Sequence, residues 1–522
     1  MTTPTTVIEA LVIRARESPE AVAYTADADA VTCSALLGDV RQMAGWLAAR
    51  GVGRGERCAI VLPTGLDFIR VVYACQLLAA VPVAVNPGLP AAAIARRLGL
   101  VRARLGIGAS DAAWLATSAG IPCPVVSAGD LSRSPGSVGP TNLPEPADAA
   151  FLQLTSGTTG EPRAVVISHR NLTASLLATA DRLELRPDDV LATWVPLHHD
   201  LGLVRYVFGA MFSGCRSHLV RPSMVNFRPW LDLVTRVRAT ITGGPDSAYR
   251  LAARTVDPKG LDLGTLRFAG NGGEPVRLAT IEAFERRFGL ANVVGPAYGL
   301  AEATLTVTST APGDALRVDD RGVVSCGRPL DGIELRIADT DGRPLPAGST
   351  GEILVRGTPV FAGYFDDERA TRHALRDGWL RTGDAGCLDR QGYLFVTARS
   401  RALIKRGGVT IAPREIEDAV NSVPGVRSSA AVGAVLSSVS GTEDVVVVAE
   451  LNAGTPHARD DVDHVVAGID AAVRRSIGFP PARVLLVPAG TIPRTAAGKV
   501  QYDELRRMVT TGALTDHRVS RA

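Results

Sequence analysis

The sequence predicts an α/β fold, because strand-like and helical segments alternate through the first half of the chain. Apolar runs at Cys58–Leu62 and Pro82–Val85 are typical of buried strands, and the helical segment Phe68–Ala80 lies between them. The same order returns with a strand at Leu191–Val195 and a helix at Leu203–Phe212. Strand, helix and strand joined by short links indicate parallel, doubly wound sheets.

The second half of the chain has a different pattern. Short strands are predicted at Gly332–Ala338, Gly351–Val355 and Gly392–Val396, separated by turn signals such as Asp-Gly at 341–342. This pattern indicates a β-rich module. After residue 399, two helices and two strands alternate again and predict a small α+β unit.

Length and charge exclude several classes of protein. The chain has 522 residues, of which 46% are hydrophobic, so it is long enough for several domains of about 100–200 residues. Its 56 basic and 53 acidic side chains leave a net charge of only +3. This balance lacks the basic surface of a nucleic-acid-binding or membrane-binding protein. The most apolar stretch, Val71–Val85, is too short to span a bilayer.

The cysteines favour a reducing compartment. Seven cysteines are scattered along the chain without a CxxC pair, so neither a disulfide framework nor a zinc site is indicated. The first twenty residues lack the apolar run of a secretory signal. We therefore expect a cytoplasmic protein without a membrane segment.

The strongest functional signal is the segment Leu154–Asn171. Glycine lets backbone N–H groups approach a phosphate closely, and hydroxyls add donors around it. Arg163 would add a positive charge. The competing interpretation is an ordinary surface loop, and the segment is no Walker A motif because Glu161 and Pro162 follow its last glycine. The candidate phosphate-binding residues are Thr155, Ser156, Gly157, Thr158, Thr159 and Gly160.

Three weaker signals follow along the chain. Tyr298 precedes the carboxylate Glu302, a pair that could stack on a base and hold Mg²⁺, although many turns contain Tyr-Gly. Asp384 in a Thr-Gly-Asp turn could accept ribose hydroxyls, or it could cap its own turn. Lys499, one of only three lysines, lies on a Gly-containing loop near the C-terminus.

In this order, the four segments resemble those of the adenylate-forming superfamily, which includes acyl-CoA synthetases, fatty acyl-AMP ligases and amino-acid adenylation domains. The resemblance covers about residues 10–508. It implies a large N-terminal domain at 1–398, built of two doubly wound subdomains and a β-barrel. A small mobile C-terminal domain at 399–522 would carry Lys499.

The resemblance also assigns roles to residues. Thr155–Gly160 and Arg163 would bind phosphates, Glu302 would bind Mg²⁺, and Lys499 would bridge the acid and the α-phosphate. His199 would lie beside the acyl carboxylate. The remaining residues expected to bind the nucleotide are Gly272, Gly273, Glu274 and Pro275 on the adenine side, Tyr298 stacked on adenine, and Asp384 and Arg399 at the ribose.

The acid pocket is expected around His199, and two interpretations of its small residues stay open. Gly270, Gly295 and Ala297 would leave room for a bulky or long acyl group, or they would serve backbone packing. Leu201 falls where amino-acid-selecting members place an aspartate, so we expect no α-amino acid. The pocket residues implied are His199, Gly270, Asn271, Gly295, Ala297 and Leu300. A metal site at 198–200 is a competing interpretation, disfavoured because adjacent residues rarely converge on one ion.

The function implied is ATP-dependent activation of a non-amino carboxylic acid, with a fatty or bulky acyl group, to acyl-AMP with release of pyrophosphate. Transfer to CoA or to a carrier-protein pantetheine would follow. Gly407 and Gly408 resemble the thiol path of CoA ligases, whereas the motif PLHHDLGL resembles fatty acyl-AMP ligases. Ala402 falls at the expected hinge, so thiolation could be slow or delegated to another enzyme. A non-catalytic relative and a luciferase-type oxygenase are competing functions. The Arg-rich composition suggests a GC-rich, actinobacterial-type source, in which ligases of this kind often serve secondary metabolism. Either a monomer or a dimer is expected.

Overall fold

The computed structural model describes most of the chain and divides it into two compact units. The described residues are 4–109, 120–129, 138–139, 143–155, 162–223, 226–320, 322–399, 404–406, 409–411, 413–435, 443–452, 459–494 and 500–514. The first unit contains Met1–Arg336, Leu354–Thr382 and Leu388–Phe395. The second contains Ile337–Ile353, Gly383–Cys387 and Val396–Ala522.

A seven-stranded sheet in the first unit confirms the parallel pattern predicted near residues 58–85. Its order is β18 (Gly363–Tyr364), β8 (Arg163–Ser168), β7 (Ala149–Thr155), β4 (Val81–Ala84), β3 (Arg57–Val61), β5 (Leu105–Gly108) and β6 (Val125–Ser127). Strand β3 runs parallel to β4 and β5, and the buried helix α3 (Leu66–Leu77) connects β3 to β4. Helix α4 (Ala91–Leu100) packs Ile94 and Leu98 against Ala59 and Val61.

A nine-stranded sheet is the second large sheet of this unit. Its order is β15 (Arg328–Pro329), β14 (Thr308–Ser309), β13 (Val294–Tyr298), β12 (Phe268–Asn271), β11 (Ile241–Gly244), β9 (Val190–Thr193), β10 (Arg216–Leu219), β1 (Val22–Ala26) and β2 (Asp29–Thr32). Neighbouring residues of one strand face opposite sides: Ala269 joins one core cluster and Phe268 another.

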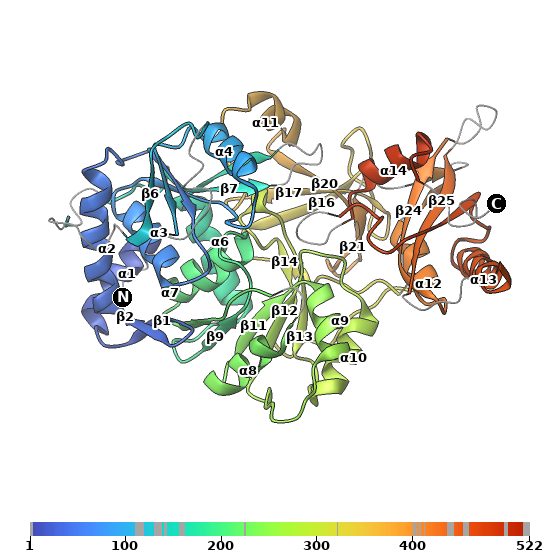
Figure 1. Cartoon of the computed structure of the whole chain (residues 1–522), viewed down its shortest axis with the longest axis horizontal. Coiled ribbons are helices and arrows are strands. Elements are labelled where there is room, and N and C mark those ends of the chain that lie inside the picture. The colour runs from blue at the N-terminus through green and yellow to red at the C-terminus, as the bar shows by residue number, and fades with distance from the viewer. Residues whose placement is uncertain are drawn as a thin grey trace. The chain divides into compact units, whose positions relative to one another are not determined.

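Helices cover both faces of this sheet, as a doubly wound fold requires. On one face α9 (Asp246–Thr255) and α10 (Leu278–Phe288) pack against each other (Figure 1), beside α8 (Arg228–Val237). On the other face Tyr206 packs with Phe268. Other helices among the described residues of the unit are α1 (Val7–Glu17), α2 (Cys33–Ala48), α6 (His169–Arg182), η3 (Ala301–Ala303) and α11 (Glu368–Ala374).

The helix predicted at Leu203–Phe212 is present but has an unexpected form. It begins as a π-helix, η2 (Leu201–Gly209), and ends as one α-helical turn, α7 (Ala210–Phe212). Near its start, a Cβ at Gly202 would lie 2.3 Å from the carbonyl oxygen of Pro196, so only glycine fits. π-Helical turns are rare and frequently occur at functional sites.

The β-rich module is a five-stranded sheet whose residues are shared between the units. It contains β16 (Ile333–Ala338), β17 (Gly351–Gly357), β20 (Trp379–Leu388), β19 (Leu375–Arg376) and β21 (Leu394–Arg399). The strand predicted from Gly392 begins two residues later. Gly392 has φ +80° and forms the turn that the side chain of Asp389 stabilises through Gln391 N and Tyr393 N.

The second unit has a three-stranded sheet with helices on both faces. Its order is β24 (Val426–Ala434), β25 (Asp444–Leu451) and β26 (Arg483–Val487). Helices α12 (Pro413–Asn421) and α13 (Arg459–Ile477) cover one face, and α14 (Tyr502–Thr510) packs on the other. A short hairpin of β22 (Ile404–Arg406) and β23 (Val409–Ile411) precedes them. The helices and strands predicted after residue 399 are therefore confirmed.

Within the described residues, no helix has both the length and the apolar character needed to cross a bilayer.

Candidate active site

The predicted phosphate-binding segment joins two antiparallel strands. Thr155 at the end of β7 lies opposite Arg163 at the start of β8. The intervening residues 156–161, and with them Ser156, Gly157, Thr158, Thr159 and Gly160, lie outside the described residues. The paired strand ends therefore define where this segment leaves the sheet and returns to it.

Arg163 lies beside an aromatic residue that the sequence did not single out. Strand β18 pairs with β8 and brings Tyr364 opposite Val165. The Arg163 guanidinium lies 5.4 Å from the centre of the Tyr364 ring, a cation–π distance. Its Nε is also 3.8 Å from Asp367 Oδ2. Both side chains of this ion pair are about one-third exposed or more, so the pair contributes less than about 1 kcal/mol.

Tyr364 connects Arg163 to the predicted magnesium carboxylate. Its hydroxyl donates a hydrogen bond of 2.8 Å to Glu302 Oε1. Burial and then the charge of Glu302 raise the pKa of Tyr364, so the hydroxyl stays protonated and remains a donor. Glu302 itself is half-buried on η3, and its backbone carbonyl accepts from Phe361 N at 2.8 Å. The residue is therefore held through both its side chain and its backbone.

The adenine-side residues begin at the carboxyl end of β12, next to the end of β13. Gly272 approaches the neighbouring strand so closely that a Cβ there would lie 2.7 Å from Ala297 O. Gly273 has φ +77°, a left-handed conformation that glycine adopts without strain. The carboxylate of Glu274 accepts from Ser247 N and Oγ at 3.0 and 2.9 Å. Pro275 is exposed, and Tyr298 is buried at the end of β13.

The two histidines before η2 differ in environment. His199 is exposed, whereas His198 is half-buried. Burial, and then the neighbouring His199, lower the pKa of His198 to about 3, so it is neutral at physiological pH. Asp200 caps the helix by accepting from Leu201 N at 2.8 Å. Within the described part of the chain, no group of three or more His, Cys, Asp or Glu side chains converges on a metal position.

The predicted pocket glycines pack against protein side chains. A Cβ at Gly295 would lie 2.0 Å from a ring carbon of Phe268, and one at Gly270 would lie 3.3 Å from that ring. Phe268 therefore already fills the space beside these two glycines. This supports the interpretation that they serve backbone packing rather than leave room for an acyl group. Asn271 is buried and donates to Asp246 Oδ1 at 3.2 Å, which is a structural contact. Ala297 and Leu300 are half-buried.

The remaining predicted residues belong to the second unit. Asp384 is half-buried within β20, directly after Gly383, whose φ of +70° forms a local bend. Gly383 N donates to Glu352 Oε1 at 3.2 Å. Arg399 is the last residue of β21. Lys499, Gly407, Gly408 and Ala402 lie outside the described residues.

A family model and curated relatives match this chain over most of its length. The family model described as "AMP-binding enzyme" matches residues 11–365. A putative acyl-CoA synthetase of Caulobacter vibrioides is 31% identical over 517 residues, covering 90% of this chain and 88% of its own. A medium-chain fatty-acid–[acyl-carrier-protein] ligase, JamA, of Moorena producens is 33% identical over 408 residues, covering 70% and 68%.

Solved structures share the fold over nearly the whole chain. A structure from a study of the fatty acyl-adenylate ligases of E. coli and L. pneumophila superposes with a TM-score of 0.85 at 26% identity, covering 97% of this chain and 98% of that one. The fold class expected from the sequence is thereby confirmed. With matches of this extent, the chain belongs to the AMP-binding enzyme family, the adenylate-forming ligases that its four motifs resemble.

Proposed function

We propose that this protein activates a non-amino carboxylic acid with ATP and Mg²⁺, releasing pyrophosphate, and then transfers the acyl group from the acyl-adenylate to a thiol. A carboxylate oxygen of the acid attacks the α-phosphorus, and the bond from that phosphorus to the pyrophosphate oxygen breaks. The carboxylate is already a nucleophile, so no general base is needed. The enzyme's task is to position two anions and neutralise their charge.

The observation that carries this proposal is the connected group Arg163, Tyr364 and Glu302. Two unit charges 4 Å apart repel by about 4 kcal/mol at an effective dielectric constant of about 20. Arg163 is poised beside the phosphate-binding segment to offset this repulsion. Its ion pair with Asp367 is weak and exposed enough to be exchanged for a phosphate oxygen.

Glu302 is suited to hold Mg²⁺. This ion is usually bound through one or two carboxylates together with substrate phosphates. A single carboxylate held by Tyr364, with no larger acidic cluster among the described residues, fits that donor set. Bound there, Mg²⁺ would neutralise charge on the phosphates.

The other roles follow the family motifs. We propose Tyr298 and residues 272–275 for the adenine, Asp384 and Arg399 for the ribose, and His199 for the acyl carboxylate. Lys499 would bridge the acid and the α-phosphate from a C-terminal domain at 399–522. The acceptor thiol would be that of CoA or of a carrier protein, with Gly407 and Gly408 along its path. The similarity to both an acyl-CoA synthetase and a carrier-protein ligase supports either acceptor.

A pyrophosphate-release screen over carboxylic acids tests the proposal. Lys499→Ala should lose adenylation by orders of magnitude, because its ammonium would stabilise charge in the transition state. Lys259→Ala is the matched control, because Lys259 is an exposed turn residue. Near-normal adenylation by Lys499→Ala would show that the role assigned to that lysine is wrong.

A stand-alone acyl-AMP ligase is the second candidate. By the family motif, Ala402 falls at the expected hinge, where a charged residue is usual. The chain also superposes on a structure from a study of fatty acyl-adenylate ligases. In that case the acyl-adenylate would be the main product, and another protein would complete the thiol transfer.

A further inference from the structure

Arg205 is a buried cation whose charge is not paired within the described residues. The side chain is only 8% exposed. Its Nη2 donates to Thr306 Oγ1 at 3.1 Å, but its Nε is buried and contacts no acceptor among the residues that the structure describes. Burial lowers the pKa of Arg205, yet a guanidinium remains charged at neutral pH.

Burying the Arg205 guanidinium without an anionic partner costs free energy of folding. Removing a guanidinium from water is unfavourable unless an anion and full hydrogen bonding compensate, and a threonine hydroxyl supplies only one neutral acceptor. Other arginines of this unit have more acceptors: Arg182, for example, donates to the carbonyl oxygens of Ser309, Arg328 and Pro329. Arg205 therefore has binding capacity that the fold does not use.

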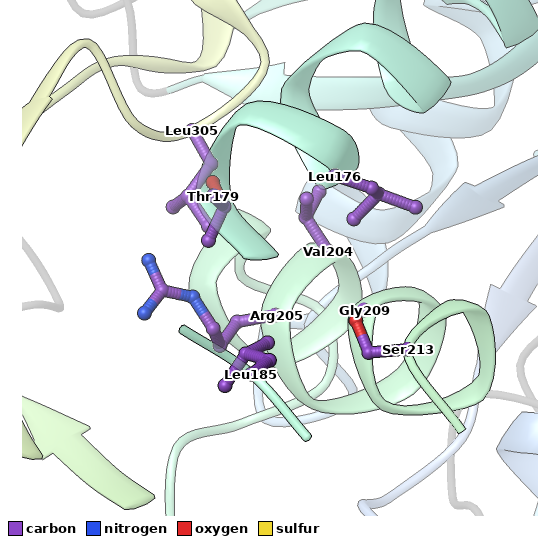
Figure 2. A pocket seen from close by; sticks show the side chains of 8 residues that line it. All are labelled: Leu176, Thr179, Leu185, Val204, Arg205, Gly209, Ser213 and Leu305. Atoms are coloured by element: carbon purple, nitrogen blue, oxygen red, sulfur yellow. The ribbon is translucent and has the colours of Figure 1, made fainter. Parts of the chain in front are cut away.

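The cavity beside Arg205 does not supply the missing anion. Figure 2 shows the side chain between Leu185 and the pair Thr179 and Leu305. Besides Arg205 itself, the polar side chains of the lining are the hydroxyls of Thr179 and Ser213. Its volume of about 10 Å³ has room for about one water molecule. No acidic side chain among the described residues lines this cavity, so an anionic ligand of Arg205 would have to approach from outside it.

Arg205 lies between the two segments that would hold the acid. It belongs to η2, which begins directly after His199 and Asp200. Its hydrogen-bond partner Thr306 lies four residues after Glu302 in the chain. The next residue, Val307, donates its backbone N–H to Tyr298 O at 2.9 Å, at the end of β13. A group bound at Arg205 would thus lie close to the residues proposed to position the carboxylate and the nucleotide.

The neighbouring side chains favour a short acid. Phe268 fills the space over Gly295, and the hydroxyl of Tyr206 would lie 2.9 Å from a Cβ at Gly243. Tyr206 and Phe268 belong to one buried cluster that also contains Leu191 and Ile241. An acyl group that entered beside Gly270 and Gly295, as the family motifs suggest, would have to displace this cluster if its alkyl chain were long.

From the buried guanidinium, which has no charged partner among the described residues, and the side chains packed over Gly295 and Gly243, we propose that Arg205 binds a second carboxylate of the substrate, and that the acid is a short dicarboxylic acid. This inference rests on the proposed function, since it assumes that the acid is adenylated at this site. A carboxylate could accept from the Arg205 Nε–H, which has no acceptor among the described residues, while Nη2 keeps its hydrogen bond to Thr306.

Matched acids test this inference. Pyrophosphate release by the full chain would be measured with succinate, glutarate and adipate, with their monoamides, and with octanoate and dodecanoate. Each monoamide keeps the size of its diacid but lacks the second charge. We expect kcat/KM for the best diacid to exceed that for its monoamide by at least about tenfold, the size of a charged hydrogen bond.

Substitution of Arg205 separates binding from structure. Arg205→Met should reduce the diacid-to-monoamide ratio toward one, and Arg205→Lys should retain part of it. Arg182→Met is the matched control and should leave the ratio unchanged, since the Arg182 guanidinium donates to three backbone carbonyls. If Arg205→Met does not fold, the ratio of kcat/KM for a diacid to that for its monoamide, measured with the unmodified protein, still tests whether the enzyme recognises a second carboxylate.

The outcomes distinguish the two proposals. Activation of octanoate or dodecanoate but not of the diacids would overturn the assignment of Arg205 and leave the adenylation proposal standing. Equal kcat/KM for the diacids and their monoamides would likewise overturn the assignment of Arg205 and leave the adenylation proposal standing. Pyrophosphate release with none of these acids would also overturn the assignment of Arg205, and only inactivity across the full screen of carboxylic acids would contradict the proposed function.

Discussion

Replacing Tyr364 with phenylalanine should impair adenylation through Glu302 without removing the aromatic ring. The hydroxyl of Tyr364 donates to Glu302 Oε1 at 2.8 Å. The ring contacts with Phe361, at 4.9 Å between centroids, and with Arg163 would persist in the variant. The change therefore tests one hydrogen bond to the proposed magnesium carboxylate.

The magnitude follows from the charge of the acceptor. A hydrogen bond to a charged group contributes about 1.5–3 kcal/mol, which corresponds to about 10–150-fold in a rate or equilibrium constant. Because Tyr364 is partly buried, solvent would compensate the loss only in part. We expect Tyr364→Phe to lower kcat/KM for ATP by about tenfold or more and to raise the Mg²⁺ concentration needed for half-maximal activity.

The assay is pyrophosphate release as a function of Mg²⁺ and ATP concentration. Tyr393→Phe is the matched control, because the ring of Tyr393 faces Arg317 and Arg328 and its backbone N–H donates to Asp389. If Tyr364→Phe has the same kcat/KM and the same Mg²⁺ dependence as this control, the hydrogen bond does not position Glu302 for catalysis.

Three further predictions concern stability and the second half-reaction. Gly295→Ala should destabilise the fold by about 1–3 kcal/mol, because its Cβ would overlap the Phe268 ring. Gly53→Ala is the control, because it adds a Cβ in open space. Equal urea midpoints for the two variants would contradict the prediction. Burial lowers the pKa of His169 from 6.5 to about 4, so below pH 6.5 the unfolded chain binds a proton that the folded chain does not. This histidine should cost about 2 kcal/mol of stability between pH 7.5 and 5, and His169→Leu should show a correspondingly shallower pH slope in urea titrations; an equal slope would refute the argument. Finally, the alanine at position 402 leads us to expect slow thiolation, so rapid CoA-dependent release of AMP by the purified enzyme would exclude the stand-alone acyl-AMP ligase.

The elements of the fold were largely predictable from local patterns. Buried parallel strands such as Cys58–Leu62 are continuous apolar runs, and the structure has β3 at Arg57–Val61. The boundaries shifted where a turn competes with a strand, as at Gly392. The π-helical form of η2 was not predictable, because apolar periodicity does not distinguish a π-helical turn from an α-helical one.

The sequence by itself determined the family and the candidate chemistry. Glycine, hydroxyl and charged residues that recognise a nucleotide lie within short segments, so their spacing is readable without a structure. Tertiary structure decided which side chains serve those segments. Tyr364 meets Glu302 across 62 positions of the chain, and Arg205 meets Thr306 across 101. It also decided that Phe268 occupies the space beside Gly295. Contacts of this kind depend on strand pairing and side-chain packing between distant segments, and a single sequence carries no local signal for them.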